Sequence, residues 1–372
     1  MKTETKCVHK GSYIDPKTGG VNTPIFTSSA FEYLGRNDQA YPRYFNTLNQ
    51  DTVIEKVVAL EGAEAGVLFG SGMAAISTSI LTFIEPGDHL AVQAEIYGGS
   101  YSFVTEHLMP QGYDCTFTST SAEAVIEACT ERTKLIYIET PTNPLLSVVD
   151  IRKVSEFAKA RGIVTLIDNT FASPILQNPY ALGIDVVLHS GTKYLGGHSD
   201  LSCGIAVSST ANADKIRHKA KLVGGCLNAQ DCYLLERSLK TLALRVERQS
   251  ANAMEIATWL DASDAIANVY YPGLPTSPYH ALAKSQMNDF GAMLSFELKS
   301  QPASDFMDRL KFIRPTLSLG GVESLICAPA TTSHLYLTQE ERDKLGISDK
   351  LLRLSVGIEH TDDLIADIKQ AL

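Results

Sequence analysis

The sequence lacks several features that define whole classes of protein. Its 372 residues contain no apolar run near the 18 or more residues that cross a bilayer. Positive charge is scarce, because 32 Lys and Arg stand against 42 Asp and Glu, and a net charge of −10 repels nucleic-acid phosphates. The first six residues hold no apolar stretch such as a secretory signal requires. We therefore expect a cytoplasmic protein with no nucleic-acid or membrane partner.

The cysteines and histidines do not follow the spacing of known disulfide or metal motifs. The seven cysteines are an odd number, and none belongs to a C-x-x-C pair. The nine histidines include no H-E-x-x-H motif. We expect reduced, mostly buried thiols, no disulfide framework and no metal site.

What is present is the composition of a globular protein with more than one domain. Hydrophobic residues make up 44% of the chain and charged residues 20%. Residues 1–50 carry many glycines and prolines and little helical periodicity, so we predict an extended arm that lies on something else, such as a second subunit. A helix is expected to begin at Asp51, with the aspartate as its cap.

Short apolar runs alternate with helical stretches in the next part of the chain. The predicted strands are Ala65–Phe69, His89–Ala94, Lys134–Glu139, Ile163–Asp168 and Asp185–His189, and the predicted helices include Val149–Ala160, ended by Gly162. This alternation is typical of a mostly parallel sheet covered on both faces. Ligands of such sheets bind beyond the carboxyl ends of the strands.

The C-terminal third predicts a smaller unit. Apolar residues from Gln230 to Leu260 indicate one long helix that bridges two domains, with a boundary near residue 245. Further strands are expected at 291–298, 315–319 and 352–358, and a helix at 362–372. The predicted class is α/β, with an arm (1–50), a large mostly parallel domain (51–245) and an α+β C-terminal domain (246–372).

The glycine loop Gly70-Ser71-Gly72 lies between a predicted strand and a predicted helix. The free N–H groups of Gly72 and Met73, together with the positive end of the helix, would bind an anion. The loop also matches G-x-G-x-x-A, with Glu95 at the place of a ribose-binding acid, so an NAD-dependent dehydrogenase is one interpretation. Glycines that only allow close helix–strand packing are another.

A second group of residues favours different chemistry. Asp168 ends an apolar strand, where burying a carboxylate is costly without a cationic partner. The next strand leads into Ser190-Gly191-Thr192-Lys193. A pyridoxal phosphate enzyme needs an amine nucleophile, a carboxylate beside the pyridine nitrogen, and hydroxyls with a helix N-terminus around the phosphate. These residues and the glycine loop supply all three, whereas a dehydrogenase leaves Lys193 unexplained.

The chain resembles the Cys/Met-metabolism family of fold-type I pyridoxal phosphate enzymes, which includes cystathionine γ-synthase, cystathionine γ-lyase, methionine γ-lyase and O-acetylhomoserine sulfhydrylase. The resemblance covers nearly the whole chain, through the residues above and through Tyr41-Pro42-Arg43, Tyr97-Gly98-Gly99-Ser100, Glu139-Thr140-Pro141-Thr142-Asn143-Pro144, Ser318-Leu319-Gly320-Gly321 and Arg353-Leu354-Ser355-Val356-Gly357. It implies a fold-type I transferase architecture, the cofactor pyridoxal 5'-phosphate, and γ-elimination or γ-replacement on a sulfur-containing or homoserine-derived L-amino acid. A β-lyase of the family and a non-catalytic carrier of the same fold are the alternatives.

The resemblance also implies a role for each matching residue. Lys193 would bond to the cofactor aldehyde and then move protons, assisted by Tyr97, which would stack on the ring, and Asp168 would pair with the pyridine nitrogen. The phosphate would contact Gly72, Met73, Ser190 and Thr192, and the substrate carboxylate would contact Arg353, Ser318 and Asn143, the last of which would alternatively contact the cofactor's phenolic oxygen.

Tyr41 and Arg43 resemble the pair that reaches the phosphate of the neighbouring subunit. This resemblance implies a dimer with shared active sites, and dimers of relatives commonly pair into homotetramers.

Three positions depart from the pattern of particular relatives. Ser102 stands where cystathionine-handling relatives often have an arginine, Gly99 where methionine γ-lyases have a cysteine, and Leu317 where several transsulfuration relatives have a glutamate. An unpaired charged group would lose a strong interaction there. We therefore expect a substrate whose distal end is small or weakly polar.

Overall fold

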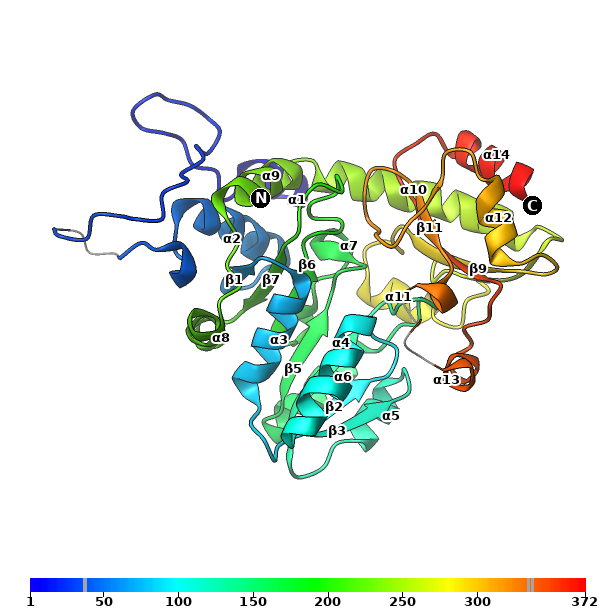
Figure 1. Ribbon diagram of the computed structural model, residues 1–372, viewed down its shortest axis with the longest axis horizontal. Coiled ribbons are helices and arrows are strands. Elements are labelled where there is room, and N and C mark those ends of the chain that lie inside the picture. The colour runs from blue at the N-terminus through cyan, green and yellow to red at the C-terminus, as the bar shows by residue number, and fades with distance from the viewer. Residues whose placement is uncertain (36–38, 333–334, 336–337) are drawn as a thin grey trace.

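The computed structural model describes residues 1–35, 39–332, 335 and 338–372. The strands are β1 (Ala65–Phe69), β2 (His89–Gln93), β3 (Asp114–Thr118), β4 (Thr133–Glu139), β5 (Val164–Asp168), β6 (Val186–Ser190), β7 (Gly204–Ser208), β8 (Ile266–Tyr270), β9 (Met293–Leu298), β10 (Arg314–Pro315), β11 (Leu325–Cys327) and β12 (Leu351–Ser355). The helices are α1 (Thr3–His9), α2 (Leu48–Glu61), α3 (Gly72–Phe83), α4 (Gly98–Ser102), α5 (Ala122–Glu127), α6 (Ile151–Arg161), α7 (Ser173–Leu176), α8 (Thr210–Val223), α9 (Ala229–Leu239), α10 (Leu242–Asp261), α11 (His280–Gln286), α12 (Ala303–Arg309), α13 (Gln339–Lys344) and α14 (Thr361–Ala371). Figure 1 shows two sheets, with α10 running from the first to the second.

The large sheet has the strand order β1-β7-β6-β5-β4-β2-β3, and within it only β7 runs antiparallel to its neighbours. Successive residues of each strand point to opposite faces, as Leu166 and Ile167 of β5 do. Helices α3 and α8 pack on one face, and α2, α6 and α9 pack on the other. The predicted mostly parallel α/β sheet is therefore confirmed, with both faces covered.

The second sheet has the order β10-β11-β12-β9-β8. Its middle strand, β12, pairs antiparallel with both β11 and β9, and this register sets Arg353 between Cys327 and Ser295. The sheet is smaller than the first, as predicted for the C-terminal region. The proposed domain limits at residues 50 and 245 stay predictions, and α10 passes through the second of them.

Two details expected for the N-terminal region were wrong, whereas an arm that contacts a second subunit stays a prediction. Residues 3–9 form helix α1, which packs against α2 and α10 of the same chain, with Cys7 buried. Helix α2 begins at Leu48 rather than at Asp51, because Thr47 and Gln50 form a reciprocal capping box that satisfies the first N–H groups. Between these helices, residues 10–35 form a loop that extends away from the body (Figure 1). The 3-10 helix Pro42–Tyr44 contacts α8.

The predicted long helix of residues 230–260 is instead two helices. Helix α9 ends at Leu239, and short-range bonds from Lys240 and Thr241 to the carbonyls of Arg237 and Ser238 tighten the turn before α10 begins. The predicted strand 315–319 was also wrong for most of its length. Only Arg314–Pro315 pairs in β10, and residues 317–319 form a loop beside the large sheet.

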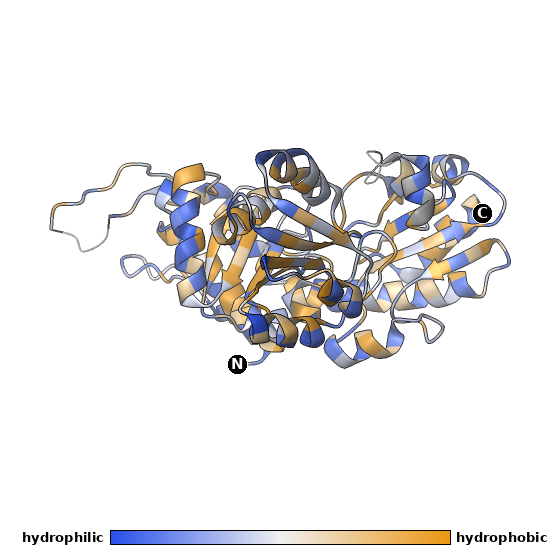
Figure 2. Cartoon of the chain, turned by 90° about the horizontal axis from the view of Figure 1, so that it is seen from below, coloured by the Kyte–Doolittle hydropathy of each residue, from blue (hydrophilic) through white to orange (hydrophobic). Residues whose placement is uncertain are grey.

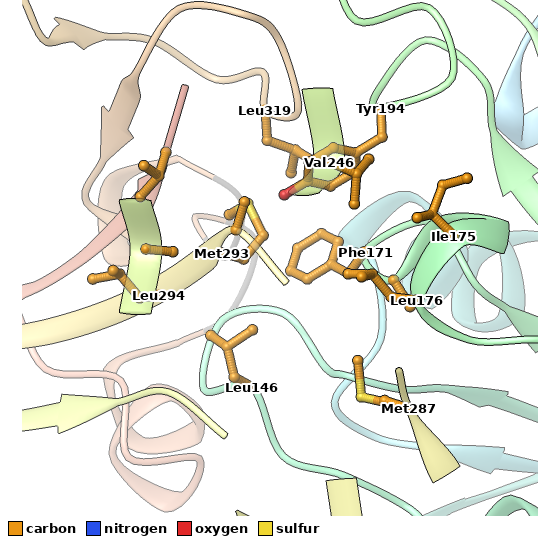
Figure 3. Packing of buried hydrophobic residues seen from close by; sticks show 14 of the residues in the cluster. Leu146, Phe171, Ile175, Leu176, Tyr194, Val246, Met287, Met293, Leu294 and Leu319 are labelled. Atoms are coloured by element: carbon orange, nitrogen blue, oxygen red, sulfur yellow. The ribbon is translucent and has the colours of Figure 1, made fainter. Parts of the chain in front are cut away.

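Apolar residues predominate among the buried residues of the large sheet, and many segments of its strands are orange in Figure 2. Buried polar side chains such as Thr165 and His189 lie among them. An apolar cluster lies at the junction between the two sheets. In Figure 3, Phe171 and Tyr194 from the loops after β5 and β6 face Val246 of α10, Met293 of β9 and Leu319 of the loop before β11. Within the described residues, no helix is both long and apolar enough to cross a membrane.

Candidate active site

A cavity of about 260 Å³ lies between the carboxyl ends of the large-sheet strands and the second sheet. Several elements that are far apart in sequence contribute to it, because parallel strands all end at the same edge. Nine of the twelve predicted site residues line it: Gly72, Met73, Tyr97, Asn143, Asp168, Ser190, Thr192, Lys193 and Arg353. Ser318 lines an adjoining pocket at the cavity mouth.

Lys193 follows the end of β6 and points its amine into the cavity. The Nζ atom donates a hydrogen bond to Oγ of Ser318 at 3.3 Å, which links the large domain to the loop before β11. Burial lowers the pKa of Lys193, and the nearby Arg353 guanidinium lowers it further. A lowered pKa increases the fraction of neutral amine near pH 7, which is the nucleophilic form.

Asp168 is the last residue of β5 and is 5% exposed. Its Oδ1 accepts a hydrogen bond from the backbone N–H of Thr170 at 3.0 Å. Burial raises the pKa of Asp168, and the hydrogen bonds from Thr170 offset only part of this effect. A cationic group inside the cavity would stabilise the charged carboxylate, as expected for a partner of a protonated pyridine nitrogen.

Arg353 faces the same cavity from β12 and is 3% exposed. Its Nη1 donates to Oδ1 of Asn143 at 2.8 Å and its Nη2 to the carbonyl of Leu317 at 3.4 Å. Its Nε is buried and has no hydrogen-bond partner in the described part of the chain. A buried guanidinium with a spare donor suits a carboxylate, which accepts two parallel hydrogen bonds.

The N-terminus of α3 forms one end of the cavity. Ser71 caps this helix by accepting from the N–H of Ala74, so the free N–H groups of Gly72 and Met73 remain, as at any helix start. A Cβ on Gly72 would lie 2.9 Å from Cβ of Ser190, so close packing also requires the glycine. The hydroxyl of Thr192 already accepts from the N–H of Cys203 at 3.0 Å. This end has the donors that a phosphate needs.

The sequence analysis missed Glu139 as a site residue. It ends β4 directly beside Asp168 in the sheet register and lines the cavity. Its Oε2 accepts from the backbone N–H of Tyr97 at 2.8 Å, and burial, followed by the Asp168 charge, raises its pKa well above the usual range. The signal that identified Asp168, a carboxylate at the end of an apolar strand, was equally present here.

Thr170 was missed as well. Its hydroxyl accepts from the N–H of Ser190 at 2.8 Å while its own N–H donates to Asp168, so it holds the ends of β5 and β6 together. It lies two residues beyond the strand, where nothing in the sequence pattern marks its contacts.

Tyr41 and Arg43 lie outside this cavity. The Nη1 of Arg43 donates to the carbonyl of Lys221 at 2.6 Å, and the guanidinium lies over the rings of Tyr41 and Tyr44. Glu95 does not line the cavity either. Its Oε2 accepts from the hydroxyls of Thr142 and Ser147. The carboxylate that a dinucleotide site would need for a ribose is thus already engaged.

The two buried carboxyls predict how the stability of the cofactor-free chain varies with pH. Burial raises the pKa of Asp168 and Glu139 above the usual value of about 4, so the folded chain keeps protons that the unfolded chain has released. The free energy of unfolding should therefore fall as pH rises from about 4 toward the raised pKa values. Glu139→Gln should flatten this fall in urea unfolding between about pH 5 and pH 8. An unchanged slope would contradict a buried, protonated Glu139.

Comparison with known proteins identifies the class to which this fold and cavity belong. A structure of cystathionine γ-lyase from Lactobacillus plantarum complexed with L-serine superposes with a TM-score of 0.96 at 42% identity, covering 100% of this chain and 98% of that one. The family described as Cys/Met metabolism PLP-dependent enzyme matches residues 4–372. The chain belongs to this family, and it is a pyridoxal 5'-phosphate-dependent enzyme.

Two curated relatives extend over the full length. The chain is 44% identical to cystathionine beta-lyase of Lactococcus lactis subsp. cremoris, over 99% of this chain and 98% of the relative. It is 43% identical to cystathionine gamma-lyase of Bacillus subtilis, over 100% of this chain and 99% of the relative. The predicted family, fold class and cofactor are confirmed, and the dehydrogenase interpretation was wrong.

The residues in the cavity fit the cofactor. The amine of Lys193, whose pKa is lowered, suits the cofactor's aldehyde. The carboxyl of Asp168 is buried, has no salt bridge among the described residues and suits the ring nitrogen. The N-terminus of α3, beside the hydroxyls of Ser190 and Thr192, suits the phosphate. No group of three His, Cys, Asp or Glu suited to a metal ion occurs in the ranges that the structure describes.

Proposed function

We propose that this chain catalyses elimination or replacement at Cγ of a sulfur-containing or homoserine-derived L-amino acid. The observation that supports this most is Arg353, which lines the same cavity as Lys193 and Asp168 and whose Nε has no hydrogen-bond partner among the described residues. An amino-acid carboxylate at Arg353 would hold the substrate's α-carbon near the lysine amine. Bound pyridoxal phosphate supplies an electron sink that stabilises negative charge at that carbon.

Each side chain has a distinct part in this proposal. Asp168 would keep the cofactor's ring nitrogen positively charged, and Ser190, Thr192 and the first N–H groups of α3 would hold its phosphate. The amine of Lys193 would take the proton from the substrate's Cα. Reaction at Cγ needs a further proton to leave Cβ and the leaving group to accept one, for which the lysine and the half-exposed Tyr97 are available.

A β-elimination is the second candidate, because several relatives at about the same identity carry the name cystathionine beta-lyase. The two routes give different products from one substrate. With water, γ-elimination of cystathionine yields cysteine, 2-oxobutyrate and ammonia, whereas β-elimination yields homocysteine, pyruvate and ammonia. Identifying the α-keto acid therefore separates them.

The mouth of the cavity supports a substrate with a small or weakly polar distal end. Ser102, Leu317 and Thr332 line the mouth, and Leu317 is 69% exposed. Apart from Lys193, the described residues of this pocket carry no charge. A distal ammonium or carboxylate would find no ionic partner among these uncharged residues. A substrate with a charged distal end would therefore have a lower kcat/KM than one with a small or weakly polar end.

We expect cystathionine to be a poor substrate by comparison. In a panel of cystathionine, methionine, cysteine, O-acetylhomoserine and O-succinylhomoserine, with and without a thiol, kcat/KM for cystathionine should be at least about tenfold below that of the best substrate. Ser102→Arg should raise kcat/KM for cystathionine specifically, and Glu106→Arg, exposed on the same helical segment, should not. A clear preference of the unmodified enzyme for cystathionine would refute this specificity. Keto-acid release indicates a lyase, and a new thioether indicates a transferase.

We also propose that the active unit is a dimer with shared sites. Tyr41 and Arg43 line a pocket separate from the cavity of their own chain, and Arg43 is bonded to α8. They follow an N-terminal segment that projects from the body in Figure 1. That segment exposes Ile25, Phe26, Phe31, Tyr33 and Leu34. Apolar side chains gathered on an extended segment favour contact with another subunit, where Arg43 would reach the partner's phosphate site.

A further inference from the structure

Three buried polar side chains form a stripe along one face of α10. Arg245, Gln249 and Asn252 are spaced i, i+4 and i+7, so they lie on one face of the helix. They are 5%, 0% and 1% exposed. Polar side chains this deeply buried are costly unless their donors are bonded. All three donate to backbone carbonyl oxygens.

Arg245 binds the segment that carries the nucleophile. Its Nη1 donates to the carbonyl of Tyr194 at 2.8 Å and its Nη2 to that of Leu195 at 3.5 Å, the two residues after Lys193. A Cβ on Gly197 would lie only 2.0 Å from the same Nη1, so the segment folds tightly around the guanidinium. Arg245 also contacts the turn before its own helix, because its Nη2 donates to the carbonyl of Ser238 at 3.0 Å and its Nε to the hydroxyl of Thr241 at 3.2 Å. Arg245 thereby ties the segment after Lys193 to the start of α10.

Gln249 and Asn252 bind the segments that carry the substrate-binding residues. The Nε2 of Gln249 donates to the carbonyls of Gly321 at 2.7 Å and Val356 at 3.2 Å. The Nδ2 of Asn252 donates to those of Gly357 at 3.0 Å and Glu359 at 2.8 Å. Gly321 follows Ser318 by three residues, and Val356 follows Arg353 by three.

The bound segments also contact each other. A Cβ on Gly320 would lie 2.8 Å from the backbone nitrogen of Tyr194, and the N–H of Gly320 donates to Oγ of Ser355 at 2.8 Å. The N–H of Val322 donates to the carbonyl of Gly197 at 3.0 Å. The segment after Lys193, the loop of Ser318 and the segment after Arg353 therefore contact one another, and all three are bonded to side chains of α10.

We propose that Arg245, Gln249 and Asn252 are positioning residues that together set the distance between Lys193 and Arg353. Each acts through the backbone that it binds. Arg245 binds on the lysine side and Asn252 on the arginine side. Gln249 binds the residue after β12 and the loop of Ser318, and this loop in turn contacts the segment after Lys193. A helix is stiff enough to serve as the common support. This inference rests on the proposed roles of Lys193 and Arg353.

The position along the stripe should decide which property changes. In the holoenzyme, Arg245→Met should shift the pH midpoint of the visible band of the cofactor bound to Lys193, with little effect on amino-acid binding. Asn252→Leu should weaken the binding of glycine, followed by the absorbance change, by about tenfold or more, with little effect on that midpoint. Gln249→Met should change glycine binding and the midpoint together.

Two further variants keep the test decisive. Ser250→Ala removes a buried hydroxyl on the same helix that has no hydrogen-bond partner among the described residues, so neither property should change. Arg245→Lys keeps the charge and one donor and should recover part of the midpoint shift, which also covers the case in which Arg245→Met fails to fold. If all folded variants only lower the melting temperature, or change both properties alike, the stripe is merely structural and the proposal is wrong.

Glycine has no leaving group, so these measurements do not depend on which reaction the enzyme performs. If none of the substrates in the panel reacts, the proposed γ-chemistry is wrong. The midpoint shift expected for Arg245→Met and the weaker glycine binding expected for Asn252→Leu would not be affected by that result. Glycine binding that is insensitive to Arg353→Leu would instead show that the role proposed for Arg353 is wrong.

Discussion

Replacing Lys193 with alanine should lower kcat by at least about 10³-fold for every substrate, because it removes both the amine that bonds to the cofactor and the proposed base. Release of α-keto acid measures the loss. The unmodified enzyme should be yellow, and borohydride should fix the cofactor to Lys193 irreversibly and remove the colour. In the variant the same treatment should leave no covalent adduct in the mass spectrum. Substantial turnover by Lys193→Ala would refute the mechanism.

Two controls separate a lost nucleophile from a misfolded chain. Lys215→Ala removes an exposed lysine on α8 and should retain full activity. Mixing Lys193→Ala subunits with Arg43→Ala subunits should restore activity, because a hybrid dimer would contain one site with both residues intact. No recovery from two variants that form mixed dimers would contradict the shared site, without bearing on Lys193 itself.

Asp168→Asn should produce the second-largest loss. The amide keeps the shape of the side chain and can still accept from the N–H of Thr170, but it carries no charge to hold the ring nitrogen protonated. Removing one partner of a buried ion pair costs about 3–5 kcal/mol, which corresponds to roughly 10²- to 10⁴-fold in kcat if the pair strengthens only in the transition state. Steady-state kinetics at saturating cofactor measures this effect.

The control for Asp168→Asn is Asp185→Asn. Asp185 precedes β6 at the opposite end of the large sheet, where its Oδ2 accepts from the N–H and the hydroxyl of Thr165. This substitution should reduce stability and leave kcat per folded enzyme unchanged. An Asp168→Asn variant that keeps the cofactor and loses less than about tenfold in kcat would show that Asp168 does not pair with the ring.

The sequence pattern predicted correctly those strands and helix ends that depend mainly on residues close together in the chain. The predicted runs Ala65–Phe69, Lys134–Glu139 and Ile163–Asp168 correspond to the buried strands β1, β4 and β5. Gly162 ends a helix as predicted, and it does so in the left-handed conformation. Lys193 and Asp168 could be found because parallel strands deliver their C-terminal residues to one edge. The break at Lys240–Thr241 could not be found, because apolar periodicity continues across it.

The sequence by itself determined the strands that lead to Asp168 and Lys193, the residues at their ends and therefore much of the chemistry of the cavity, since burial, helix polarity and side-chain type follow from local order. Only the tertiary structure decided that Glu139 accepts from the backbone of Tyr97, that Arg353 donates to Asn143, and that α10 binds both sides of the site. Those contacts join residues up to 210 positions apart, and backbone carbonyls accept hydrogen bonds identically whatever residue carries them. No pattern of residue types encodes which carbonyl a buried Arg245 will meet.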